Sequence, residues 1–154
     1  MSLDISDRIP DLTLPASGGV DIRLRDFEGR NLVLYFYPKD NTPGCTQEGQ
    51  DFGQAYDAFQ AAQTDILGIS RDSVRAHDNF IAKYDFPFPL LSDKDEQACD
   101  AFSVIVEKNM YGRKYLGIDR STWLFDKNGK LRQVWRKVKV KGHVDQVLEA
   151  ARAL

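Results

Sequence analysis

The distribution of apolar and polar residues predicts strands that alternate with helices. Residues 31–37 and 65–70 are nearly continuous apolar runs, which is the pattern of strands covered on both faces. Between these runs, apolar side chains recur at helical spacing and form one stripe, made of Phe52, Ala55, Tyr56, Phe59 and Ala62. A second helix is expected after the second run, capped by Asp72 or Ser73 and ending near Tyr84.

Shorter patterns fill the rest of the first two thirds of the chain. Residues 12–15 and 20–25 are separated by Gly18-Gly19, and the second of these segments alternates apolar and polar residues, so they predict an N-terminal hairpin. A short strand is expected at residues 90–91 and a short helix over residues 95–102.

The C-terminal part predicts a hairpin followed by a helix. Segments 121–125 and 130–138 flank Asp-Lys-Asn-Gly at residues 126–129, which is a strong turn signal. The last helix is expected to start near His143. Strands that alternate with helices before a closing hairpin predict an α/β domain with a mixed central sheet flanked by helices. Because no repeat or linker interrupts the pattern, we expect one domain over residues 1–154.

Composition and charge exclude several classes of function. The chain has 154 residues, 21 basic and 23 acidic, for a net charge of −2, so its overall charge indicates neither a nucleic-acid partner nor an anionic membrane. No apolar run approaches the length of a membrane span. The polar, acidic N-terminus lacks the features of a signal peptide. We therefore expect a cytoplasmic protein.

The chain has two cysteines, Cys45 and Cys99. Two cysteines do not form a disulfide scaffold, and neither Cys-x-x-Cys nor a Cys/His cluster offers a metal site. We expect no metal and no organic cofactor.

Cys45 stands where the first helical pattern begins. The apolar run breaks at Pro38, a polar loop follows, and Pro43-Gly44 precedes the cysteine. The first N–H groups of a helix lack intrahelical partners and carry partial positive charge, so they stabilise an anion. A thiol at such a position loses its proton more easily, and the thiolate is the reactive form. The position favours a nucleophile, although a lone cysteine is often only a small buried side chain.

The spacing Pro38-x-x-x-Thr42-x-x-Cys45 resembles the active-site signature of the peroxiredoxins, and the flanking residues are similar to the bacterioferritin comigratory protein (Q-type) branch. The likeness continues through ordered blocks at residues 67–70, 89–93 and 111–122. It implies a thioredoxin-like fold and a thiol-dependent peroxidase that forms a sulfenic acid on Cys45. It also implies a peroxide substrate and an external thiol reductant, namely thioredoxin, glutaredoxin or a small thiol.

The resemblance assigns roles to residues that spacing alone would leave ordinary. Thr42 and Arg120 are implied to act on the sulfur and the peroxide, and Pro38 is implied to shield them. Taken alone, Thr42 reads as a helix cap and Arg120 as a surface residue before a strand. The Gly44 N–H is a candidate donor to the peroxide oxygens. Glu48 is implied to orient Arg120, although an acid in a first helical turn is also common.

The sequence departs from the family at the resolving cysteine. One usual position holds Gln50, and the other falls within residues 77–83, which contain no thiol. Cys99 matches neither position and is interpreted as a buried small residue. We therefore expect a one-cysteine cycle in a monomer or weak dimer. The alternatives are a Cys45–Cys99 disulfide recycled by thioredoxin, a thiol–disulfide oxidoreductase, and a redox sensor or holdase.

Three other features are given no catalytic role. His77 falls on the apolar side of a helix with no acidic partner implied, so we expect it to pack in the core. His143 is expected to be a cap or a surface residue. The basic run at residues 132–141 alternates lysine with valine, as on a solvated strand face, and we expect it to bind no nucleic acid.

Overall fold

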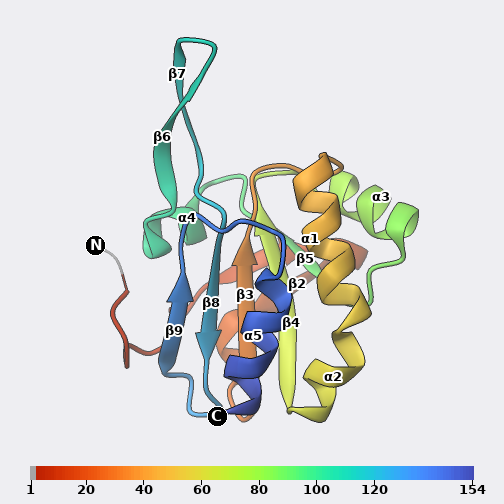
Figure 1. Cartoon of the computed structure of the whole chain (residues 1–154), viewed down its shortest axis with the longest axis vertical. Helices are drawn as coiled ribbons and strands as arrows, with labels where there is room; N and C mark the ends of the chain where they lie inside the picture. The colour runs from red at the N-terminus through yellow and green to blue at the C-terminus, as the bar shows by residue number, and fades with distance from the viewer. Residues whose placement is uncertain (1–2) are drawn as a thin grey trace.

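The computed structural model describes residues 3–154 and is organised around a seven-stranded sheet (Figure 1). The strands are β1 (Thr13–Ala16), β2 (Val20–Arg23), β3 (Asn31–Phe36), β4 (Thr64–Ser70), β5 (Leu90–Ser92), β6 (Ile105–Met110), β7 (Arg113–Ile118), β8 (Ser121–Phe125) and β9 (Leu131–Trp135). The α-helices are α1 (Pro43–Gln54), α2 (Tyr56–Ala61), α3 (Val74–Tyr84), α4 (Gln97–Phe102) and α5 (His143–Arg152). Two short 3-10 turns, η1 (Ser17–Gly19) and η2 (Leu24–Phe27), flank β2.

The sheet is mixed, as the sequence predicts. Its strand order is β2-β1-β5-β4-β3-β8-β9. Strands β3, β4 and β5 run parallel, whereas β8 pairs antiparallel with β3 and β9 antiparallel with β8. The predicted N-terminal hairpin is present as the antiparallel pair β1–β2.

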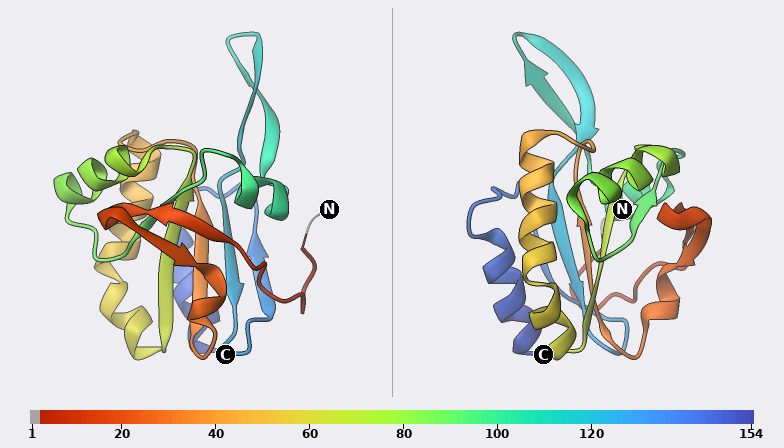
Figure 2. Two further views of the ribbon diagram at one scale, coloured as in Figure 1. Left: turned by 180° about the vertical axis from the view of Figure 1, so that it is seen from behind. Right: turned by 90° about the vertical axis from the view of Figure 1, so that its right-hand side faces the viewer.

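Strand β3 separates two hydrophobic cores. Its side chains alternate between them, with Leu34 and Phe36 in one core and Tyr35 in the other. The core around Tyr35 also holds side chains from α1, α2 and α5, and these helices cover one face of the sheet (Figure 2). The opposite core holds residues of α4 and of the N-terminal segment.

Three parts of the fold differ from the sequence prediction. The first helical stripe is divided at Ala55, so it forms α1 and α2 instead of one helix. Strand β9 ends at Trp135, three residues before the predicted end, and residues 136–142 form a loop. The hairpin β6–β7 has no counterpart in the prediction.

The β6–β7 hairpin forms a separate two-stranded sheet that projects beyond the body of the protein (Figures 1 and 2). Its turn contains Tyr111 and Gly112, with φ of 53° and 79°, the positive values that a tight two-residue hairpin turn requires. The base of the hairpin is closed by a hydrogen bond from the Asp119 N–H to the Val104 carbonyl at 2.7 Å. The residue after Asp119 is Arg120, so the hairpin rises directly beside a predicted site residue.

Residues 3–154 contain neither a membrane-spanning helix nor a cluster of metal ligands. None of the helices there combines the length and the apolar character of a membrane span. That part of the chain also contains no group of three or more His, Cys, Asp or Glu side chains placed to hold a metal ion.

Candidate active site

Cys45 lies in the first turn of α1, directly after the loop that follows β3. Pro43 is the first residue of the helix and lacks an N–H, and Gly44 and Cys45 follow it. Helix geometry leaves the N–H groups of Gly44 and Cys45 without intrahelical carbonyl partners. The Cys45 side chain is 2% exposed and belongs to the core on the α1 side of the sheet. The thiol is therefore shielded and is placed beside donors suited to an anion.

Arg120 brings a guanidinium to this thiol from the loop before β8. Its Nη2 donates to Cys45 Sγ at 3.4 Å, and its Nη1 donates to Glu48 Oε1 at 2.6 Å. Glu48 is fully buried, and its Oε2 accepts no hydrogen bond. The structure thus brings together Cys45, Arg120 and Glu48, three of the residues that the sequence singles out.

Burial and charge act in opposite directions on Glu48. Burial raises its pKa to about 7, although the Arg120 charge and hydrogen bond favour the carboxylate. Desolvation lowers the pKa of Arg120, but the charges of Glu48 and Cys45 outweigh it and raise that pKa. Arg120 therefore remains a cation, whereas Glu48 changes charge near neutral pH.

Gly44 makes room for the guanidinium. A Cβ atom at this position would lie 3.1 Å from Arg120 Nη2, tighter than ordinary van der Waals contact, so the guanidinium would have to shift by a few tenths of an ångström. The absence of a side chain at Gly44 allows Arg120 to lie over the helix start and reach Cys45. This steric role is separate from the donor role that the sequence suggests for the Gly44 N–H.

Thr42 and Pro38 flank the same loop. Thr42 is the N-cap residue of α1 but makes no side-chain capping bond, so the helix-cap interpretation is wrong in that respect. Its hydroxyl instead donates to the Lys39 carbonyl at 2.8 Å. Pro38 is half-buried at the start of the loop. The catalytic roles that the resemblance implies for both residues stay predictions.

A buried polar network holds the loop from the side opposite Arg120. Asp40 accepts from the Tyr37 hydroxyl at 2.6 Å and lies 2.7 Å from Nδ1 of the fully buried His77. His77 Nε2 lies 2.8 Å from the Leu91 carbonyl oxygen. The Asp40 N–H in turn donates to Asp72 Oδ2 at 2.9 Å.

The prediction that His77 packs in the core is confirmed, but the absence of an acidic partner is wrong. Asp40 is 37 positions away in sequence, and no spacing rule connects the two residues. The available signals were a histidine on an apolar helix face and an aspartate in the polar loop before Thr42.

The prediction for His143 is wrong: the residue is buried, 4% exposed, although it opens α5 as expected. Its Nε2 lies 2.7 Å from Thr122 Oγ1. Burial, together with the charge of Arg120, lowers the pKa of His143 to about 4. The ring is therefore neutral at physiological pH.

Cys99 lies on α4, in the core on the other side of the sheet from Cys45. It is fully buried, in agreement with its interpretation as a small buried residue. Burial raises the pKa of its thiol far above the ordinary value, and the hydrogen bond and charge of Asp93 act in the same direction. Such a thiol stays protonated and makes a poor nucleophile.

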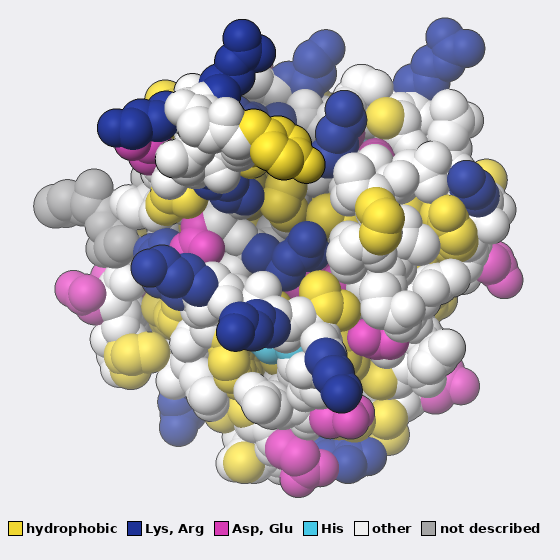
Figure 3. Space-filling view, turned by 45° about the horizontal axis from the view of Figure 1, so that its top comes forward, with side chains coloured by type: hydrophobic (Ala, Val, Ile, Leu, Met, Phe, Trp, Pro, Cys, Tyr) yellow, Lys and Arg dark blue, Asp and Glu magenta, His cyan; other side chains and the backbone are white. Residues whose placement is uncertain are grey.

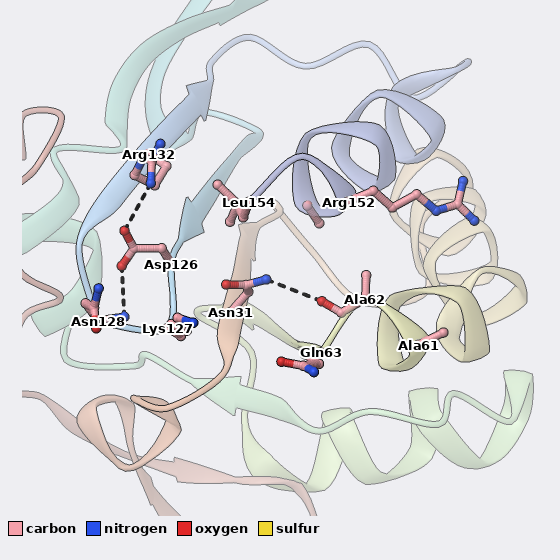
Figure 4. A pocket seen from close by; sticks show the side chains of 11 residues that line it. Asn31, Ala61, Ala62, Gln63, Asp126, Lys127, Asn128, Arg132, Arg152 and Leu154 are labelled. Carbon is pink, nitrogen blue, oxygen red and sulfur yellow. Dashed lines mark hydrogen bonds and ion pairs between the residues drawn. The ribbon is translucent and has the colours of Figure 1, made fainter.

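A separate hollow lies at the opposite end of the sheet, near the start of β3 and the β8–β9 turn (Figure 4). Asp126 pairs there with Arg132 at 3.3 Å, and the Asn31 amide donates to the Ala62 carbonyl. The residues that line it include no cysteine or histidine. We assign no chemistry to this hollow.

Comparisons with known proteins identify the family and the fold. The AhpC/TSA family model matches residues 5–134. Peroxiredoxin Bcp of Xanthomonas campestris pv. campestris is 58% identical over 143 residues, which are 93% of this chain and 89% of that protein.

Two solved structures are similarly close. One, described for the alkyl peroxide reduction activity of the X. campestris bacterioferritin comigratory protein, is 55% identical with a TM-score of 0.91, covering 97% of this chain and 98% of that one. A mutant of PrxQ from Xylella fastidiosa is 43% identical with a TM-score of 0.94, covering 99% and 98%. These neighbours confirm the thioredoxin-like fold.

Proposed function

The chain belongs to the AhpC/TSA family and is a thiol-dependent peroxidase, and we propose that Cys45 is its peroxidatic residue. The observation that carries this proposal is the contact between Arg120 Nη2 and Cys45 Sγ at 3.4 Å. It places a permanent cation against a shielded thiol at the start of a helix. Both features stabilise the thiolate, which is the form that attacks a peroxide.

In the proposed oxidation step, the Cys45 thiolate attacks one peroxide oxygen and the O–O bond breaks. The sulfur becomes a sulfenic acid, and the other oxygen leaves as an alkoxide or hydroxide that takes up a proton. Arg120 and the N–H groups of Gly44 and Cys45 stabilise the charge that moves onto the oxygens. Thr42 acts as a hydrogen-bonding group beside them, and Pro38 forms part of the shielding wall.

Glu48 is proposed to be a positioning residue. It holds Nη1 of Arg120, and this bond directs the other guanidinium nitrogen toward Cys45. Since the carboxylate is buried beneath the cation, its contact is with Arg120 and not with solvent.

A one-cysteine cycle is supported by the placement of Cys99. Strand β3 lies between the cores that hold the two cysteines, so an intramolecular disulfide requires substantial rearrangement. The high pKa of the Cys99 thiol also disfavours attack on a sulfenic acid. We propose that an external thiol reduces Cys45 directly.

The proposed substrates are hydrogen peroxide and organic hydroperoxides. The related X. campestris protein is described for alkyl peroxide reduction, and this supports the organic class. The reductant is proposed to be thioredoxin, glutaredoxin or a small thiol. We further propose a cytoplasmic monomer or weak dimer, in keeping with two unpaired cysteines.

The decisive experiment treats the reduced protein with one equivalent of peroxide, traps sulfenic acid and maps peptides by mass spectrometry. We expect a sulfenic acid on Cys45, overoxidation under excess peroxide, and loss of turnover in Cys45→Ser. A stoichiometric Cys45–Cys99 bridge that thioredoxin reverses would overturn the one-cysteine cycle. Oxidation of Cys45 no faster than that of a free thiol would instead favour a redox sensor.

A further inference from the structure

The β6–β7 hairpin presents different residues on its two faces. Its register pairs Lys108 with Tyr115 and Met110 with Arg113, and these four side chains share one face because alternate residues of a strand point to the same side. That face carries two cations and no acid. On the other face, Glu107 pairs with Lys114 at 3.6 Å.

Lys108 is held against the ribbon near its base. A Cβ at Gly117 would lie 3.2 Å from Lys108 Cδ and 3.3 Å from the Tyr115 ring, so the bare glycine allows the lysine stem to lie across the hairpin. The side chain is half-buried. Within residues 3–154, no carboxylate lies within ion-pairing distance of Lys108.

Lys108 lies across Gly117, three residues before Arg120, and its ammonium interacts electrostatically with both Arg120 and Cys45. Partial burial and the Arg120 charge lower the pKa of Lys108, while Asp119 and Cys45 act in the opposite direction. Asp119 is already engaged, since it accepts from the Lys137 N–H at 3.1 Å and pairs with Arg136 at 3.7 Å. Two cations, Lys108 and Arg120, therefore act on the reactive sulfur, and the neighbouring acid Asp119 is already engaged.

Other cations surround this position. Lysine and arginine side chains gather over the end of the molecule that carries the hairpin and the start of α1 (Figure 3). Exposed cations in the hairpin, in the loop after β3 and in the loop after β9 contribute to this end, namely Lys39, Arg113, Lys137, Lys139 and Lys141. The protein as a whole has a net charge of −2, so the positive field is local to this face.

We propose that Lys108 and its hairpin face form the docking position for an anionic, carboxylate-bearing thiol that reduces Cys45. This inference rests on the proposed one-cysteine cycle. A hydroperoxide is neutral and gains little from a cation beyond Arg120. A thiol attacks as the thiolate, and Lys108 attracts both that charge and a carboxylate on the same molecule.

The reduction then takes two balanced steps. The thiolate attacks the sulfenic sulfur of Cys45, an S–S bond forms, and the S–O bond breaks with release of hydroxide, which takes up a proton. A second thiolate attacks the sulfur of the bound thiol. This releases the Cys45 thiolate and a small-molecule disulfide.

The test compares thiols that differ in charge. Protein oxidised with one equivalent of hydrogen peroxide is mixed with mercaptopropionate, mercaptoethanol or cysteamine, and the loss of sulfenic acid is followed by stopped flow at several salt concentrations. Rates are corrected for the thiolate fraction of each reagent. We expect the anionic thiol to react faster than the neutral one, the cationic thiol to react slowest, and the advantage of the anion to shrink as salt rises.

Three variants locate the effect. Lys108→Gln should lower the ratio of the mercaptopropionate rate to the mercaptoethanol rate about tenfold, since electrostatic steering of this kind changes association rates by roughly 10- to 1,000-fold. Gly117→Ala retains the charge but displaces Lys108, so it should lower the same ratio. Lys127→Gln removes an exposed lysine charge at the other end of the sheet, in the β8–β9 turn, and should leave the ratio unchanged.

The proposal is overturned if the ratio of the mercaptopropionate rate to the mercaptoethanol rate is the same in the wild type and in all three variants. Lys108→Gln could instead slow only the oxidation of Cys45 by a carboxylate-bearing hydroperoxide, relative to its oxidation by tert-butyl hydroperoxide. That result would assign Lys108 to substrate binding, and it would also overturn the proposal. If Cys45 forms no sulfenic acid in the first mixing step, the peroxidatic role of Cys45 is contradicted. That outcome is distinct from a failure of the docking proposal.

Discussion

Gly44→Ala should slow peroxide reduction without destabilising the fold. The new Cβ would lie 3.1 Å from Arg120 Nη2, against an optimal separation of about 3.5–4.0 Å. The guanidinium cannot move aside freely, because Nη1 is held by Glu48 Oε1 at 2.6 Å. The added methyl group therefore displaces the nitrogen that donates to Cys45 Sγ.

The size of the effect follows from that hydrogen bond. A hydrogen bond to a charged group contributes about 1.5–3 kcal/mol, and a shift of roughly half an ångström weakens it without abolishing it. A loss of about 1–2 kcal/mol in the transition state corresponds to roughly five- to thirtyfold in rate. The backbone itself accepts alanine, since Gly44 is not among the residues with positive φ. Alanine also favours the helix over glycine by up to about 1 kcal/mol.

The assay is the second-order rate constant for oxidation by hydrogen peroxide, measured by stopped flow beside a thermal melt. Gly53→Ala is the matched control in the same helix, because its Cβ would meet only Pro87 Cδ at an ordinary 3.4 Å. It should raise the melting temperature slightly and leave the rate constant unchanged. If Gly44→Ala oxidised as fast as Gly53→Ala, the steric role of Gly44 and the importance of the Arg120 contact would both be refuted.

Four further variants test the remaining assignments. Cys99→Ser should retain most turnover with a small thiol, measured as peroxide loss, whereas activity that depends on Cys99 would contradict the one-cysteine cycle. Arg120→Ala should slow oxidation a hundredfold or more in stopped flow and leave Glu48 without its partner. The folded pKa of Glu48, about 7, lies above its ordinary value of 4.5, so the folded protein holds a proton that the unfolded chain releases, and stability should fall by about 2.5 kcal/mol between pH 5 and 8. Urea melts of Glu48→Gln should show a flatter dependence of stability on pH. His77→Ala removes the buried hydrogen bond between His77 Nδ1 and Asp40 and should cost about 1–3 kcal/mol in the same melts. In an Asp40→Asn background the cost of His77→Ala should be smaller, and an equal cost there would contradict the pairing.

The central strands of the sheet were predictable because they are buried. Strands β3 and β4 are buried at nearly every position, and such apolar runs are visible in sequence, whereas β8 and β9 were indicated by the turn signal at residues 126–129. The β6–β7 hairpin escaped prediction for the opposite reason. Most of its residues are exposed, so no buried face imposes the alternation that identifies a strand, and only the glycine of the Tyr111-Gly112 turn marks it.

The site was predictable only where one motif spans it. The segment from Pro38 to Cys45 is continuous, so the sequence indicated its residues together. Arg120 needed the resemblance, since 75 positions separate it from Cys45. Neither a continuous motif nor the resemblance indicated the Asp40–His77 pair or the position of Lys108. Both depend on which loops the sheet brings together at the end that carries Cys45.

Helix α1 contains Gly49 and Gly53, and glycine inside a helix ordinarily weakens it by about 1 kcal/mol relative to alanine. A Cβ at Gly49 would lie 2.6 Å from the ring of Phe86, so this glycine allows close packing of that ring against the helix. One residue earlier, Glu48 is buried beneath Arg120, and unwinding the first turns would break that ion pair and expose the packed ring. On the other side of the loop, the Asp40–His77 pair restrains the segment that precedes the helix. Local unfolding that brought Cys45 to Cys99 across the sheet would disrupt all three contacts. These contacts therefore favour an external thiol that reaches Cys45 in the folded protein.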